Sequence, residues 1–434
     1  MAKSWIQYHA RKFVFSALSR IQNGRLTIIS KYPGADVEQV IFGQQPTKDS
    51  DEDLGVAVVI KDPNAWTRLC QAFDLGFAEA YMLQEVECEN LVGLFTLYVA
   101  NRDFLGFSGN FLYRLLPRIS KLIFNPTNNL THARMNASFH YDTSNDLFSG
   151  FLSPDMNYSS AIWSGDLDEP LESAQQRKIH NIIEKARIAS SDHVLDIGCG
   201  WGYFAMEAVK VTGCRVTGVT LSAEQKTLAE KKIKAAGLGD RIDIVLCDYR
   251  KAPRPEGGYD KVVSIEMLEH VGDKYMNAYF ESISKYLKPV GGIMVIQGIT
   301  NINMIHNNMP DVETFIDRYI FPGGYLPTVN QLVTSIHAGS KGSLEIETVQ
   351  NIGPHYIRTL QCWKENFERN WGSIRASYVE KHKDATEEDI EAFRRRWLYY
   401  FMYCEAGFRI RILNDYVISA VRTPEPDIPS NVPH

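Results

Sequence analysis

The chain has 434 residues, of which 44% are hydrophobic and 23% charged, a makeup typical of a soluble globular protein with room for two cores. Its 46 basic and 52 acidic residues give a formal net charge of −6, so composition provides no overall attraction to nucleic acid or anionic lipid. The seven cysteines never stand at C-x-x-C spacing, which argues against a disulfide framework or a zinc knuckle. We expect reduced thiols, no metal site and no nucleic-acid partner.

The amino-terminal stretch, residues 1–20, mixes basic and polar residues into its apolar positions. It shows neither the continuous apolar segment nor the small-residue cleavage site of a signal peptide. The longest strongly apolar run, residues 91–100, is much shorter than the about 20 residues that a membrane-spanning helix needs. We therefore expect a cytoplasmic protein without a transmembrane anchor.

Residues 1–125 are expected to form a smaller α+β domain. Alternation of apolar and polar residues predicts strands at 25–30 and 56–60, and residues 78–86 have a helical pattern. No catalytic motif occurs in this region. We expect the domain to bind lipid or to mediate dimerisation, so a homodimer is left open.

A basic and apolar segment ends this region. It contains Arg114, Arg118, Lys121 and Arg134, with no acid between the first and the last. Such a segment can rest on a membrane surface, which would make the protein peripherally membrane-associated, although a core-facing helix with a solvated basic face explains it equally well. Residues 126–184 are expected to form a linker and cap helices over the site of the next domain.

From about residue 185 the pattern alternates between strand and helix. Strands are predicted at 194–197, 215–220, 242–247, 261–265 and 293–299, with helical segments between them. This alternation predicts a parallel, doubly wound α/β sheet in a domain of residues 185–434. An insertion is expected at about residues 301–343.

A glycine-rich turn follows the first of these strands. Gly198, Gly200 and Gly202 form G-x-G-x-G, which lets the backbone turn tightly and approach a ligand at the start of a helix. A dinucleotide site would prefer G-x-G-x-x-G and an acid at the end of the second strand, where this chain has Thr220. A nicotinamide cofactor is therefore the weaker interpretation.

The run VLDIGCGWG, with GVTLSAEQ and CDY after the next two strands, resembles class I (Rossmann-like) methyltransferases. That resemblance implies S-adenosylmethionine as the cofactor. It assigns the three glycines to the cofactor's amino-acid end, Thr220 and Gln225 to the ribose, and Asp248 with Tyr249 to the adenine. Leu221 is a further cofactor-binding candidate. Tyr158 and Ser159 are also expected to contact the cofactor.

Three further motifs narrow the family. The motifs are FHYDTSNDLFSGFLSPDMNYSSAIW (139–163), EMLEHVG (266–272) and NIGPHYIRTL (351–360), and together they resemble the cyclopropane fatty acid synthases and their mycolic acid relatives. The resemblance implies transfer of a methylene group to the cis double bond of an acyl chain in an unsaturated phospholipid. The extra amino-terminal domain fits the longer, phospholipid-acting members better than the shorter mycolate enzymes.

This chemistry explains the residue types. An alkene is itself the nucleophile, so the site has to align it with the sulfonium methyl group, exclude water and stabilise a carbocation. Tyr356 and Tyr141 are candidates for the last task through their aromatic faces. Ring closure then needs removal of a proton, which the resemblance assigns to a bound bicarbonate ion.

The resemblance places this bicarbonate among five residues: Ser160, Glu269, Gln297, Ile299 and Tyr356. Two of them depart from the family pattern, because Ser160 stands where a Cys is frequent and Gln297 where a His is frequent. Both side chains still form hydrogen bonds with an anion, but neither ionises as His does, so bicarbonate binding stays open.

Other functions remain as alternatives. The product can be a methyl or methylene branch instead of a ring, or the substrate can be a small amine, because plant alkaloid N-methyltransferases resemble the same family. A noncatalytic lipid carrier is the alternative from a different class. The motif YIFPGGYLP (319–327) is expected to be part of a lid over the acyl chain, with a structural turn at residues 322–324 as the simpler interpretation.

Overall fold

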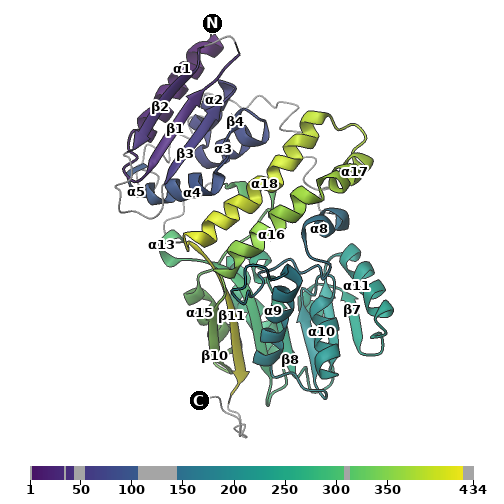
Figure 1. The fold of residues 1–434 in the computed structure, drawn as a ribbon. Coiled ribbons are helices and arrows are strands. Elements are labelled where there is room, and N and C mark those ends of the chain that lie inside the picture. The colour runs from purple at the N-terminus through teal and green to yellow at the C-terminus, as the bar shows by residue number, and fades with distance from the viewer. Residues whose placement is uncertain (1, 34–35, 44–53, 106–143, 307–312, 424–434) are drawn as a thin grey trace. The chain divides into compact units, whose positions relative to one another are not determined.

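The computed structural model describes residues 2–33, 36–43, 54–105, 144–306 and 313–423 (Figure 1). The chain forms two compact units. The first comprises residues 1–147, 307–322 and 367–410, and the second comprises residues 148–306, 323–366 and 411–434. The predicted basic segment at 114–134 and Tyr141 lie outside the described residues.

The first unit contains a four-stranded sheet in the order β2-β1-β3-β4. Its strands are β1 (Arg25–Ser30), β2 (Glu38–Gly43), β3 (Gly55–Ile60) and β4 (Val86–Glu87). The strands β1 and β3 are parallel, whereas β2 and β4 pair antiparallel at the two edges. Side chains alternate between buried and less buried along β1 and β3, so the period-two pattern that predicted these strands is confirmed.

The first unit also contains helices. They are α1 (Ala2–Leu18), α2 (Asn64–Gln71), α3 (Phe73–Met82), α4 (Leu91–Ala100), α5 (Arg102–Leu105), α14 (Phe315–Tyr319), α17 (Trp371–Lys381) and α18 (Glu387–Arg409). The long helix α18 begins at a capping box formed by Thr386 and Asp389, and it packs against α3 and α4. Among the described helices, none combines the length and apolarity needed to cross a bilayer.

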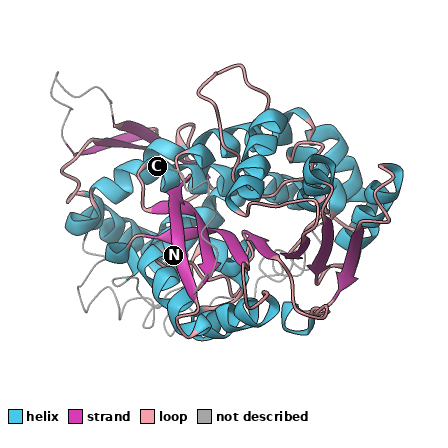
Figure 2. Cartoon of the chain, turned by 90° about the horizontal axis from the view of Figure 1, so that it is seen from below, coloured by secondary structure: helices cyan, strands magenta, loops and turns pink. Residues whose placement is uncertain are grey.

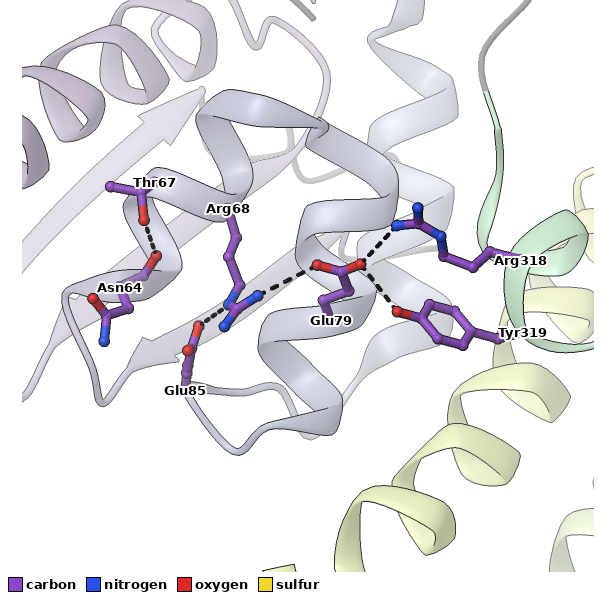
Figure 3. A network of polar contacts seen from close by, with 7 residues as sticks. All are labelled: Asn64, Thr67, Arg68, Glu79, Glu85, Arg318 and Tyr319. Carbon is purple, nitrogen blue, oxygen red and sulfur yellow. Dashed lines mark hydrogen bonds and ion pairs between the residues drawn. The ribbon is translucent and has the colours of Figure 1, made fainter. Parts of the chain in front are cut away.

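A buried carboxylate in α3 ties three segments of the first unit together (Figure 3). Glu79 accepts hydrogen bonds from the Tyr319 hydroxyl at 3.0 Å and from Arg318 at 3.2 Å. It also lies 3.4 Å from Arg68, which pairs with Glu85 at 2.8 Å. The network thereby fixes α14, which belongs to the predicted insertion, to the amino-terminal sheet and helices.

The second unit is built on a seven-stranded sheet in the order β10-β11-β9-β8-β5-β6-β7. Its strands are β5 (His193–Ile197), β6 (Arg215–Thr220), β7 (Ile242–Leu246), β8 (Lys261–Ile265), β9 (Ile293–Asn301), β10 (Leu344–Asn351) and β11 (Leu413–Arg422). The five strands from β5 to β9 are parallel, and β11 lies antiparallel between β9 and β10. The predicted parallel, doubly wound sheet is confirmed.

Helices cover both faces of this sheet, so its strands lie between two helical layers (Figure 2). One face packs on α9 (Leu171–Lys185), α10 (Tyr203–Thr212) and α11 (Ala223–Ala235). The other face packs on α12 (Met276–Tyr286) and α15 (Val329–Ser340). The remaining described helices are α8 (Asn145–Phe151), α13 (Asn303–His306), α16 (His355–Arg369) and the short η1 (Tyr249–Lys251), η2 (Leu268–His270) and η3 (Asp273–Tyr275).

The predicted insertion divides between the units at the proline-glycine turn, since α14 belongs to the first unit and residues from Gly323 onward to the second. Gly323 has φ +75°, which favours glycine, so the turn predicted at residues 322–324 is confirmed. A lid function for this motif stays a prediction.

Candidate functional site

The glycine turn joins β5 to α10 at the carboxyl edge of the parallel strands. Gly198, Gly200 and Gly202 all have positive φ, and a Cβ at Gly200 would meet no atom within 4 Å. The backbone at Gly200 therefore borders open space, as a ligand-binding turn requires. A Cβ at Gly198 would lie 2.8 Å from Cγ of Met267, so the segment after β8 packs directly against this turn.

The turn fits the amino-acid end of S-adenosylmethionine. Just before it, Asp196 is buried, and its Oδ2 has no hydrogen-bond partner among the described residues. Burial raises the pKa of Asp196 to about 7. A cofactor ammonium group would supply the missing partner and favour the charged carboxylate, and the open backbone at Gly200 leaves room for the cofactor's small amino-acid end.

The residues predicted for the ribose and adenine follow the next two strands along the same edge. The Thr220 hydroxyl at the end of β6 donates to Oε1 of Gln225 at 2.7 Å, and Leu221 is 77% exposed. After β7, Asp248 caps η1, and hydrogen bonding to Arg250 lowers its pKa to about 2. Tyr249 lies edge-on to Tyr279, with ring centroids 5.3 Å apart. The strand order brings these residues to one side of the glycine turn.

Ser159 and Tyr158 lie in the loop before α9. The buried Lys178 donates to the Ser159 hydroxyl at 2.5 Å, and Gln175 donates to the Ser159 carbonyl at 2.7 Å. The ring of Tyr158 belongs to an aromatic cluster. Its rings are those of Phe148, Phe151, Tyr158, Trp201, Tyr356 and Trp363. The cluster connects Trp201 of the glycine turn with Tyr356, through ring centroids 5.0–5.9 Å apart.

Three of the residues predicted to hold bicarbonate meet around a carboxylate that was not predicted from the sequence, Glu266. Its Oε1 accepts from the Ser160 backbone N–H and from Nε2 of Gln297, both at 2.8 Å. Its Oε2 accepts from the Tyr356 hydroxyl at 2.5 Å. Ser160, Gln297 and Tyr356 are thus brought together as expected, but the anion among them is a side chain of the protein.

Glu269 follows Glu266 by three residues and accepts a hydrogen bond from a different donor. Its Oε1 accepts from the Ile299 backbone N–H at 2.6 Å, while its buried Oε2 has no hydrogen-bond partner among the described residues. Burial, and then the charge of Glu266, raise the pKa of Glu269 to about 8. Glu269 and Ile299 therefore form their own pair, separate from the three donors on Glu266.

Few positively charged side chains of the described residues lie near Glu266 and Glu269 to balance their charge. The Asp415 side chain accepts a hydrogen bond from Nε2 of Gln297 at 2.8 Å. Burial raises the pKa of Asp415 well above the usual range. The only buried lysine among them, within the part of the chain that the structure describes, is Lys178, whose own pKa burial lowers to about 8. Burial also raises the pKa of Glu266, but hydrogen bonds with Tyr356, Ser160 and Asp415 and the charge of Lys178 oppose that shift. Glu266 is therefore the carboxylate best equipped to carry negative charge.

The backbone at Glu266 is strained. This residue follows β8 with φ +47°, a left-handed conformation that costs a non-glycine residue about 1–2 kcal/mol. Its N–H donates to the Gln297 carbonyl at 2.8 Å, which holds the turn in place. Strain of this kind persists where the surrounding structure fixes it, and it is common at functional sites.

Four residues of the site were not predicted from the sequence: Glu266, Lys178, Asp196 and Asp415. A signal for Glu266 existed, because polar residues directly after a parallel strand meet at the ligand-binding edge of the sheet. Lys178 stands on the buried stripe of α9, between Gln175 and Ile179, where a lysine is unexpected. Nothing in the sequence pattern marks Asp415, which lies inside the final strand.

This fold, with its open glycine turn and buried carboxylates, defines a class I S-adenosylmethionine-dependent methyltransferase. The chain belongs to the mycolic acid cyclopropane synthetase family, whose model matches residues 128–418. It is 36% identical over 402 residues to the tuberculostearic acid methyltransferase UfaA1 of Mycobacterium tuberculosis, with 89% of this chain and 88% of that protein covered. It is 34% identical over 364 residues to the cyclopropane-fatty-acyl-phospholipid synthase of Escherichia coli, with 81% and 84% covered.

A solved structure supports the same assignment. The mycolic acid cyclopropane synthase CmaA1, complexed with SAH and CTAB, matches with a TM-score of 0.56 at 26% identity, over 67% of this chain and 98% of that one. The predicted family, fold class and cofactor are confirmed. The chain is an S-adenosylmethionine-dependent methyltransferase that acts on lipid.

Proposed function

We propose that this enzyme transfers a methylene group from S-adenosylmethionine to the cis double bond of an unsaturated phospholipid acyl chain, forming a cyclopropane. The observation that carries the proposal is the buried Tyr356–Glu266 pair, with its 2.5 Å hydrogen bond, in a segment that packs on the glycine turn through Met267. A proton acceptor and an aromatic ring thus lie next to the cofactor turn.

The bound cofactor supplies an electrophilic methyl group, and the side chains of the site act on the alkene. The rings of Tyr356 and Trp363, both buried, offer faces that stabilise positive charge on the alkylated carbon. The aromatic cluster excludes water, which would otherwise capture the cation. A buried carboxylate then accepts a proton from the transferred methyl carbon, and the electron pair of that C–H bond closes the ring.

Similarity to the phospholipid-acting enzyme of Escherichia coli, which extends over 81% of this chain, supports a phospholipid substrate. We expect the enzyme to meet this substrate at a membrane surface, with the basic segment of residues 114–134 as the predicted contact. Peripheral association and a homodimer stay predictions.

A methyl or methylene branch is the second candidate product. It is favoured by the 36% identity to a tuberculostearic acid methyltransferase over 89% of this chain. The first step is the same in both cases, namely alkylation of a double bond by the cofactor's methyl group. A cyclopropane and a methylene branch differ in which bond forms when the proton leaves, whereas a saturated methyl branch additionally requires reduction of the methylene group by a hydride donor.

One experiment separates these outcomes. The enzyme is incubated with methyl-deuterated S-adenosylmethionine and vesicles of unsaturated phospholipid, and the lipid is analysed by mass spectrometry and NMR. A cyclopropane and a methylene branch each lose one deuterium from the methyl group, and NMR distinguishes them by ring methylene signals or alkene signals. A saturated methyl branch should form only when a hydride donor is added. Cofactor binding without labelled lipid would contradict the proposal and favour a carrier or an amine substrate.

A further inference from the structure

The donors assigned to bicarbonate are already used by the protein. The Ser160 backbone N–H, Gln297 and Tyr356 donate to Glu266 at 2.8, 2.8 and 2.5 Å, and the Ser160 hydroxyl donates to the Ala161 carbonyl at 3.1 Å. The remaining predicted donor, the Ile299 N–H, donates to Glu269 at 2.6 Å. An added bicarbonate ion would have to displace Glu266 to reach Gln297 and Tyr356, and it would compete with Glu269 for the Ile299 N–H, so the residues present do not fit it.

Glu266 has the properties that a bound bicarbonate would otherwise supply. It is a carboxylate with the same kind of oxygen atoms, and each of its two oxygens receives a hydrogen bond. Its position is enforced by a strained backbone with φ +47° and by the bond from its N–H to the Gln297 carbonyl. The carboxylate is therefore held among the three donors by a backbone conformation that is itself unfavourable.

Charge distribution also favours Glu266 as the ionised group. Lys178 acts on Glu266 by charge attraction, and Tyr356 and Ser160 hydrogen-bond to it. Asp415, next to Gln297, has its pKa raised well above the usual range by burial and by the charge of Glu266, which favours its neutral form. The neighbouring charges and hydrogen bonds therefore favour Glu266 over Asp415 as the base of the site.

We infer that Glu266 itself is the catalytic proton acceptor and replaces bicarbonate, so that turnover needs no added anion. This inference rests on the proposed function. The proton passes from the transferred methyl carbon to a carboxylate oxygen of Glu266, and the C–H electron pair forms the last carbon–carbon bond. No further oxidant, reductant or cofactor is consumed.

The first test compares wild-type turnover in carbon-dioxide-free buffer with turnover after addition of bicarbonate. We expect less than a twofold difference. A loss of more than tenfold on depletion, reversed by bicarbonate, would overturn the inference while leaving the proposed function intact. Absence of lipid product under both conditions would instead refute the proposed function itself.

The second test uses two variants of the same residue. Glu266→Gly removes the carboxylate, relieves the left-handed strain and opens space among the three donors. Glu266→Gln fills the space with a neutral amide. We expect both to lose at least about 100-fold in turnover, and only Glu266→Gly to recover with bicarbonate or formate, in a saturable manner.

Circular dichroism and affinity for S-adenosylhomocysteine serve as controls that both variants are folded. The inference is wrong if Glu266→Gly keeps wild-type turnover without an added anion. It is equally wrong if the two folded variants respond alike to bicarbonate, because the vacated carboxylate position would then not be the anion site.

Discussion

Tyr356 and Glu266 lie 90 residues apart in the chain, and the Tyr356 hydroxyl donates to Oε2 of Glu266 at 2.5 Å. Burial raises the pKa of Glu266, and this hydrogen bond opposes the shift. The ring of Tyr356 also lies edge-on to Trp363, with centroids 5.9 Å apart. The residue therefore has two separable parts, a hydroxyl that stabilises a carboxylate and a ring that can stabilise a cation.

Tyr356→Phe keeps the ring and removes the hydroxyl. Loss of a hydrogen bond to a charged group costs about 1.5–3 kcal/mol, so we expect kcat to fall roughly 10- to 100-fold. The pKa of Glu266 should rise further, because an interaction that lowers it is gone. The acid limb of the pH–rate profile should then move to higher pH, which measurement of kcat between about pH 6 and 9 will show.

Tyr259→Phe is the matched control for this change. It removes a hydroxyl that donates to the Pro253 carbonyl at 2.5 Å, away from the carboxylates. Its pH–rate profile should follow that of the wild type. An unshifted acid limb in Tyr356→Phe would show that Glu266 is not the group whose ionisation controls turnover.

Glu269→Gln should change how stability depends on pH. The pKa of Glu269 is raised from 4.5 to about 8, so the folded protein binds more protons than the unfolded chain between these values. Glu269 therefore reduces stability as pH rises through this window. Gln cannot ionise and still accepts a hydrogen bond from the Ile299 N–H. The free energy of unfolding of Glu269→Gln should therefore exceed that of the wild type by on the order of 1–3 kcal/mol near pH 8.

Urea unfolding of wild type and Glu269→Gln at about pH 6 and 8 checks this difference. The same variant should lose less turnover than Glu266→Gln, because Glu269 is expected to support Ile299 and not to accept the proton. An equal difference in unfolding free energy at both pH values would contradict the shifted pKa. If Glu269→Gln loses more turnover than Glu266→Gln, Glu269 and not Glu266 is the catalytic base.

Much of the second unit could be predicted from sequence, because short apolar runs and a glycine turn alternate with helical patterns. The grouping of Ser160, Gln297 and Tyr356 followed from family resemblance, and the structure brings them together. The carboxylate between them could not be predicted in this way, because the motif EMLEHVG contains both Glu266 and Glu269 and does not distinguish them. In the structure Glu266, which adopts a left-handed conformation, is the one of the two that reaches Tyr356.

The division of the insertion between the two units also could not be predicted from the sequence. Residues of α14 belong to the first unit because Arg318 and Tyr319 bond to Glu79, about 240 residues earlier in the chain. No local pattern reports a polar contact of such sequence separation. Local periodicity predicts elements, whereas side-chain networks of this kind depend on the folded arrangement.

Glu79→Gln should destabilise the first unit (Figure 3). Glu79 is 7% exposed, and its loss of charge leaves Arg318 and Tyr319 with a weaker acceptor, although Arg68 keeps Glu85. We expect a loss of about 1–3 kcal/mol in the free energy of unfolding, and faster proteolysis around α14. Urea unfolding and limited proteolysis measure the two effects.

An exposed ion pair of the same unit provides the comparison. Glu387 pairs with Arg375 at 2.5 Å, but its side chain is 79% exposed. Glu387→Gln should therefore change the free energy of unfolding by less than about 0.5 kcal/mol. Equal effects of the two substitutions would mean that the Glu79 network contributes no more than a surface pair.

Gly200→Ala tests the cofactor turn against backbone strain. Gly200 and Gly291 both have positive φ, +52° and +69°, and a Cβ at either would meet no protein atom within 4 Å. Alanine should therefore cost each about 1 kcal/mol of stability. Only at Gly200 should the methyl group also occupy cofactor space, lowering affinity for S-adenosylhomocysteine at least tenfold in calorimetry. If Gly200→Ala binds like Gly291→Ala, the cofactor does not approach the backbone at this turn.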